Sequence, residues 1–198
     1  MKLKNLALLG TSIFSLVPAF AMAQDIAEEE IITVTGTRSV RLATDVVGNQ
    51  ASVSGSEIEF LSPTHINEAL QGIAGANISR NNGQESLISL RSPIFTGAGA
   101  CGAFLTAQDG VPLRAAGFCN VNELFESFSG QAGRIEIVRG PGSVLYGSNA
   151  MHGIINIVSK GVGDASSSAS MEAGSWGYLK FNASGAFKDG NNGFRVTR

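Results

Sequence analysis

The hydrophobic residues of this chain fall into short runs separated by turn residues, except at the N-terminus. There, residues 6–20 form one apolar stretch, shorter than the roughly 20 residues that a helix needs to cross a bilayer. Lys2 and Lys4 precede the stretch and Ala21-Met22-Ala23 follows it, which is the pattern of a cleavable secretory signal peptide. A buried N-terminal helix is the alternative. We predict export, with a mature chain that begins at Gln24.

From residue 51 to 162 the pattern predicts a compact α+β unit of short elements. Strands are expected at 52–54, 87–91, 103–107, 134–138 and 153–159, a helix at 122–128, and turns at 81–83 and 109–112. Ser62-Pro63 predicts the start of another helix, because serine caps helices and proline suits the first helical position. The run 134–138 alternates as a half-buried strand does.

The last segment changes to a period of two. In Tyr178 to Phe187 apolar and polar residues alternate, which is typical of a strand in an outer-membrane barrel with lipid on one side and water on the other. The apolar side holds Leu179, Phe181, Ala183 and Phe187, and the polar side holds Lys180, Asn182 and Ser184. Trp176 and Tyr178 fit an interfacial aromatic girdle. An edge strand of a soluble domain would give a similar pattern.

Composition narrows the function classes. Charged residues make up 15% of the chain, and 25 of its 198 residues are glycine, which favours a turn-rich β structure over disorder. The net charge of −2 gives no basic footprint, so no nucleic-acid partner is expected. Gly97 to Gly102 matches a dinucleotide-binding pattern, but the turn at 109–112 leaves little room for the helix that should follow. Gly142 to Gly147 has phosphate-loop spacing without the lysine. We expect no enzyme, cofactor or metal site.

Two cysteines, Cys101 and Cys119, lie in the exported part. An even pair in an oxidising compartment predicts a disulfide. This disulfide would close the loop between the two cysteines and stabilise the fold by roughly 3 kcal/mol if unstrained. Two free thiols, or half of a metal site, are the alternatives.

Two stretches carry a family resemblance. Residues 30–38, EIITVTGTR, resemble the TonB box of TonB-dependent outer-membrane receptors. Residues 134–160, RIEIVRGPGSVLYGSNAMHGIINIVSK, resemble the end of the plug domain of the same family. The resemblance implies a small plug domain with a mixed β-sheet and short helices, followed by the first antiparallel strands of a truncated transmembrane β-barrel.

The resemblance also implies the partner that supplies energy. In the family TonB, working with ExbB and ExbD in the inner membrane, grips the box from the periplasm. Its residues here are Glu30, Ile31, Ile32, Thr33, Val34 and Thr35. A β-branched run with no strand partner nearby is expected to stay extended, so that it can add itself to the partner's sheet edge.

Two arginines and two loops complete the candidate site. Arg91 and Arg139 match positions where plug arginines of relatives pair with barrel carboxylates, so they could latch the closed plug; solvated arginines are the alternative. Ser92-Pro93 stands where a glycine is usual, which puts the local turn in doubt. The loops 92–102 and 114–120 are expected at the ligand, and a disulfide would tie them together. The expected lining residues are Pro93, Ile94, Phe95, Thr96 and Phe118.

The predicted organisation follows. It comprises a signal peptide (1–23), a periplasmic tether (24–50) with the TonB box (30–35), a plug (51–162) and the start of a barrel (163–198). We expect a protein of the cell outer membrane, in contact with its lipid, that takes up an extracellular ligand such as a ferric siderophore or another iron complex. A free-standing periplasmic plug that binds TonB or ligand is the alternative. Since little chain precedes the box, no role in transcriptional signalling is expected.

Overall fold

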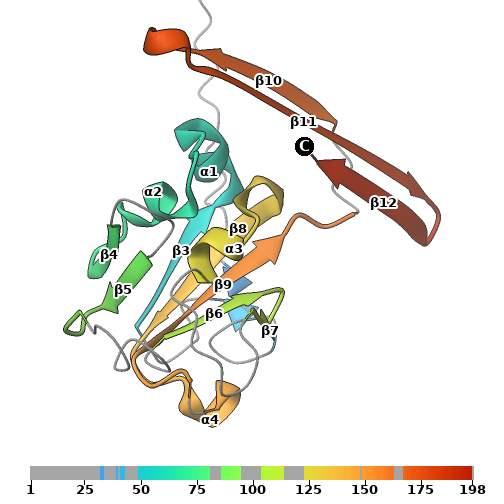
Figure 1. The fold of residues 1–198 in the computed structure, drawn as a ribbon. Helices are drawn as coiled ribbons and strands as arrows, with labels where there is room; N and C mark the ends of the chain where they lie inside the picture. The colour runs from blue at the N-terminus through green and yellow to red at the C-terminus, as the bar shows by residue number, and fades with distance from the viewer. Residues whose placement is uncertain are drawn as a thin grey trace, which may run out of the picture.

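The computed structural model describes residues 32–33, 39, 41–42, 49–80, 86–94, 104–113, 123–147, 149–162 and 167–197. These residues form a mixed five-stranded sheet, a three-stranded antiparallel sheet and two-stranded ribbons, together with short helices (Figure 1). The α+β fold class expected from the sequence is confirmed.

The five-stranded sheet is the centre of the fold. Its strands, in spatial order, are β3 (Gln50–Ser54), β8 (Ala132–Arg139), β9 (Gly153–Ser159), β6 (Phe104–Gln108) and β7 (Val111–Pro112). Only the β6–β9 pair is parallel among the pairs of this described sheet. The half-buried character expected for 134–138 is wrong: Ile135, Glu136 and Ile137 are all at most 1% exposed. β8 lies inside the sheet, and its middle is covered on both faces.

Residues of alternating direction along these strands enter two cores. The larger core joins Val53, Ile135 and Ile155 to apolar side chains of α1, α2, α3, β4 and β5. These elements are α1 (Gly55–Leu61), α2 (Ile66–Leu70), β4 (Ala76–Arg80), β5 (Ser86–Leu90) and α3 (Glu123–Glu126). The smaller core joins Leu105 and Ile154 to Ala150 and α4 (Ser143–Tyr146). The helices therefore hold the sheet from both sides.

The first helix begins earlier than the sequence pattern suggested. Ser54 caps α1, and its side chain accepts a hydrogen bond of 3.2 Å from the Glu57 amide. Ser62 is instead the C-cap, with φ of 44°, and its amide donates to the Ile58 carbonyl at 3.0 Å. The prediction that a helix starts at Ser62 is wrong, because the next helix starts only at Ile66. The missed signal is Ser54-x-x-Glu57, the spacing of a capping box.

The turn expected at 109–112 is confirmed at Asp109-Gly110, whereas Val111 and Pro112 form β7. Asp109 and Gly110 have positive φ, 51° and 78°, as a tight hairpin between β6 and β7 requires. The Asp109 carboxylate also accepts from the Ser159 amide and hydroxyl, each at 2.7 Å. The turn therefore fastens the end of β9. The other expected turn, 81–83, lies outside the described residues.

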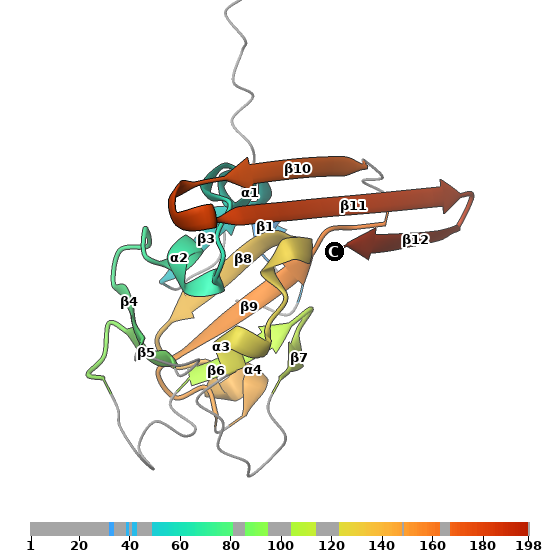
Figure 2. The same cartoon turned by 45° about the horizontal axis from the view of Figure 1, so that its top comes forward.

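The three-stranded sheet lies across one end of the plug (Figure 2). Its order is β10 (Ser168–Ala173), β11 (Leu179–Asp189) and β12 (Asn192–Thr197), all antiparallel. The 3₁₀ turns are η3 (Ser129–Gln131) and η4 (Ser175–Gly177). The large exposed apolar residues of this region are Met171, Trp176, Tyr178, Leu179, Phe181, Phe187, Phe194 and Val196. No helix in the described part of the chain is long and apolar enough to span a membrane.

Candidate functional site

The excursion between β8 and β9 is the most constrained part of the candidate site. The amide of Gly140 donates to the His152 carbonyl at 2.9 Å, and that of Gly142 donates to the Ala150 carbonyl at 2.8 Å. A Cβ on Gly142 would lie 2.4 Å from Ile154 Cδ1, and a Cβ on Gly153 would lie 2.8 Å from the Val138 carbonyl oxygen. Glycine is needed at Gly153, because a Cβ there would meet the backbone of β8, whereas a Cβ on Gly142 would require the Ile154 side chain to shift.

The two expected latch arginines lie beside the same glycine. Gly75 has φ of 79°, and a Cβ on it would stand 2.7 Å from Arg91 Cγ and 3.9 Å from Arg139 Cδ. Arg91 has φ of 55°, and its amide donates to the Gly75 carbonyl at 2.8 Å. The structure thus brings Arg91, which follows β5, and Arg139, which ends β8, together.

Arg139 is tied to the plug backbone. Its guanidinium donates to the Gln50 carbonyl at 3.0 Å and also to the Ala74 carbonyl. Neither Arg139 nor Arg91 forms an ion pair with a carboxylate of the described residues, where Glu136 pairs with Arg134 and Glu59 with Lys160. The alternative of a purely solvated Arg139 is therefore wrong, whereas pairing with a barrel carboxylate stays a prediction.

The departure at Ser92-Pro93 changes how the turn is made. Arg91 itself takes the left-handed conformation, and Ser89 Oγ donates to the Ser92 carbonyl at 2.5 Å. Pro93 and Ile94 follow in exposed positions, and their contact with a ligand stays a prediction. The other expected lining residues, Phe95, Thr96 and Phe118, and both cysteines, Cys101 and Cys119, lie outside the described residues.

Part of the segment expected to be the TonB box forms a strand. Ile32 and Thr33 form β1 (Ile32–Thr33), which pairs antiparallel with β2 (Arg41–Leu42). The expectation that the run has no strand partner is wrong for these two residues. Glu30, Ile31, Val34 and Thr35 lie outside the described residues.

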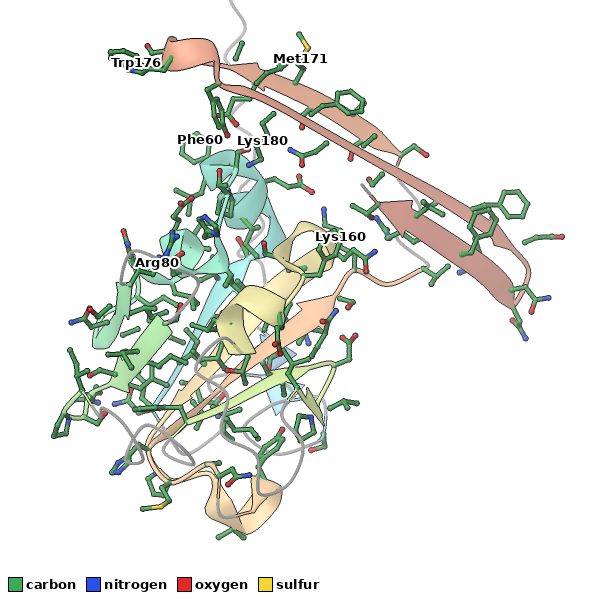
Figure 3. The ribbon with its side chains drawn as sticks, in the orientation of Figure 1. Phe60, Arg80, Lys160, Met171, Trp176 and Lys180 are labelled. Atoms are coloured by element: carbon green, nitrogen blue, oxygen red, sulfur yellow. The ribbon has the colours of Figure 1, made fainter. Side chains whose placement is uncertain are left out.

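A cavity of about 230 Å³ with both polar and apolar lining was not anticipated from the sequence. It lies where α2, the β4–β5 ribbon and α3 meet, and Arg80 supplies its cationic group (Figure 3). Its lining residues are Thr64, His65, Ile66, Asn67, Arg80, Ser86, Leu124, Ser127, Phe128 and Ser129. No cluster of three or more potential metal ligands occurs within the described ranges.

The mixed sheet, the β8–β9 excursion and the two arginines beside Gly75 lie in one α+β unit. The family model for the TonB-dependent Receptor Plug Domain matches residues 43–154. This chain belongs to that family.

Solved structures share the fold at low identity. The ferric yersiniabactin uptake receptor FyuA of Yersinia pestis is 24% identical, with a TM-score of 0.58 over 73% of this chain. The pyoverdine receptor FpvA of P. aeruginosa is 18% identical, with a TM-score of 0.63 over 78%. The alcaligin receptor FauA of Bordetella pertussis is also 18% identical, with a TM-score of 0.58 over 78%. This chain spans only 22%, 20% and 26% of these three chains, respectively.

Proposed function

We propose that this chain is the plug and energy-coupling part of a TonB-dependent receptor in the cell outer membrane, which takes up a ferric siderophore or another iron complex. The observation that carries the proposal is the β8–β9 excursion, whose glycines and closing hydrogen bonds form inside the segment that matches the plug family. The similar structures are receptors of ferric yersiniabactin, pyoverdine and alcaligin. They favour an iron chelate here.

The β10–β12 sheet supports a receptor over a free-standing plug. Met171, Leu179 and Phe181 are all more than 60% exposed, while Lys180 and Asn182, on the other face of β11, are partly buried. A soluble protein gains nothing from such an apolar face, whereas a barrel strand needs one toward lipid. We propose that residues 163–198 begin the barrel wall and that the signal peptide 1–23 directs export.

The TonB box is the proposed energy input. Ile32 and Thr33 would leave the β1–β2 ribbon, and Glu30 to Thr35 would pair with the sheet edge of TonB, which ExbB and ExbD energise. Backbone hydrogen bonds would bear the load, while Ile31, Ile32 and Val34 would give side-chain specificity. A proline in this run would prevent the pairing with TonB, because proline lacks the backbone N–H that donates to the neighbouring strand.

The proposed site also includes a latch to the barrel wall and a surface for the ligand. Two arginines that share Gly75 concentrate positive charge at one point of the plug, which is where a wall carboxylate would gain most. Pro93, Ile94, Phe95, Thr96 and Phe118 are proposed to contact the ligand. A disulfide between Cys101 and Cys119 would join their loops and carry ligand contact from one to the other.

The test uses the purified chain and the periplasmic domain of TonB. Ile32→Pro should weaken binding at least about tenfold, since it removes a strand hydrogen bond. Ala27→Pro, in the tether outside the box, should bind as the native chain does. Equal binding by both variants would overturn the box assignment. In cells, uptake of a panel of radiolabelled ferric catecholates and hydroxamates should fall with Ile32→Pro at unchanged expression.

A further inference from the structure

Helix α1 lies between the plug sheet and the β10–β12 sheet, and a lysine holds it from each side. Lys160, just after β9, pairs with Glu59 of α1. Lys180, in β11, reaches the chain at the C-terminal end of α1. Figure 3 shows Lys180 on the side of β11 that faces α1, while Met171 of β10 points away from the plug. The helix therefore links the two sheets.

The Lys180 ammonium finds a complete set of acceptors there. Its Nζ donates to the Ser62 carbonyl at 2.6 Å, to the Ser62 hydroxyl at 3.2 Å and to the Pro63 carbonyl at 3.2 Å. An ammonium has three donors and no acceptor, so each of its hydrogens has an oxygen. Carbonyls past a helix end lack partners within the helix, and a cation is favoured there by the helix dipole.

Lys180 is one of several side chains that join the segment 62–64 to the β10–β12 sheet. The Ser62 hydroxyl donates to Glu172 of β10 at 3.1 Å. The hydroxyls of Thr64 and Tyr178 lie 3.4 Å apart. Glu172 stands directly opposite Lys180 in the β10–β11 register, so two strands of the sheet grip the segment 62–64 together.

The position of these contacts along the chain indicates a mechanical role. The tether leads into β3, whose only described neighbour in its sheet is β8. β3 leads directly into α1 through Ser54, and α1 ends at Ser62. Displacement that enters from the N-terminal side therefore passes through β3 and α1, and meets the β10–β12 sheet first at Lys180.

We propose that Lys180 anchors the C-terminal end of α1 to the β10–β12 sheet and so stops the displacement of β3 and α1 from spreading further into the plug. The anchor follows from the contacts alone. Its role under load rests on the proposed function, which places the pulled box ahead of β3. The acceptors are mainly backbone oxygens, which a substitution does not remove. The lysine is therefore the part of this contact that a variant can change.

Hydrogen–deuterium exchange of the full chain, purified in detergent, tests the anchor. Lys180→Met keeps the length of the side chain and removes its charge and donors. Exchange in residues 55–64 should rise about tenfold or more, as loss of a charge-assisted hydrogen bond predicts, while β8 and β9 stay unchanged. Lys188→Met is the matched control, because Lys188 lies in the same strand and is exposed, and its side chain makes no hydrogen bond or ion pair within the described residues.

Pulling the tether of single molecules tests the stop. The native chain and Lys188→Met should pause after β3 and α1 are released, and Lys180→Met should not. Native-like exchange in residues 55–64 of Lys180→Met, or a retained pause, would overturn the proposal. Neither readout involves TonB or a ligand, so failure here leaves the proposed function standing, and loss of TonB binding through Ile32→Pro leaves the anchor standing.

Discussion

Gly55 and Gly133 meet so closely that a Cβ on Gly55 would lie 2.5 Å from the Gly133 carbonyl oxygen. Gly55 opens α1, and Gly133 sits where the β8–β9 register shifts between Ala132 and Arg134. The start of α1 is thus set directly on a strand irregularity. This approach fixes the position from which α1 reaches the β10–β12 sheet.

Gly55→Ala should therefore destabilise the plug by about 2 kcal/mol, in the range of overpacked sites, because backbone cannot move aside as a flexible side chain can. The measurement is urea unfolding, monitored by the circular dichroism of the backbone. Gly72→Ala is the control, since nothing lies within 4 Å of a Cβ there. It should change the free energy of unfolding by less than about 0.5 kcal/mol. Equal effects at the two sites would contradict the close approach.

Gly75→Ala tests how closely Arg91 and Arg139 pack against Gly75. Gly110→Ala is its control, because both glycines have nearly equal φ, +79° and +78°, but nothing lies near a Cβ on Gly110. Each change should cost about 1 kcal/mol for the left-handed backbone. Gly75→Ala should cost more, because Arg91 must be displaced. The difference between the two variants, measured by thermal unfolding, reports the crowding alone, and it would vanish if Arg91 did not contact Gly75.

Ser62 occupies a left-handed C-cap, so glycine should be accepted there. Ser62→Gly removes the hydroxyl and its bonds to Lys180 and Glu172, but it keeps the two carbonyl acceptors and relieves about 1 kcal/mol of backbone cost. We expect a net change below about 0.5 kcal/mol in the free energy of unfolding. Ser62→Val should instead cost about 2 kcal/mol, because a β-branched residue resists positive φ. Chemical denaturation of both variants distinguishes them, and similar losses would contradict the assigned cap.

Arg134 and Glu136 form an ion pair of 2.6 Å in which the Glu136 side chain is 2% exposed. Arg134→Met leaves that carboxylate buried without its cation. We expect a loss of about 2 kcal/mol, less than for a fully buried pair because Arg134 is 31% exposed. Adding Glu136→Gln should recover part of the loss, since the neutral amide is cheaper to bury. A double-mutant cycle by urea unfolding measures the coupling, and a value near zero would mean that the pair contributes nothing.

Local chemistry explains which elements could be predicted. Asp109-Gly110 determined its turn because both residues tolerate positive φ. The pattern did not predict β4, since Ile78 is its one buried side chain, and its pairing with β5 supplies what its own pattern lacks. α1 escaped because Phe60 is 88% exposed, which obscures a helical period.

The candidate site was less predictable, because it depends on residues distant in sequence. The motifs identified Arg91 and Arg139 separately, but only the fold places both beside Gly75. The period of two assigned Lys180 to the polar face of its strand, with water as the expected neighbour. Its actual neighbours, Ser62 and Pro63, come from an element that the pattern did not reveal.

The pairing of β3 with β8 also bears on how the chain acquires its structure. Gln50 stands opposite Val138, and Ser54 opposite Arg134, so β3 waits for most of the plug to be synthesised before its ladder can form. Contacts this distant make folding slow. We expect such a chain to stay open longer than one whose strands pair with near neighbours in the sequence. In pulse-labelled refolding, we expect the β4–β5 ribbon to gain protection before β3, and simultaneous protection would refute this order.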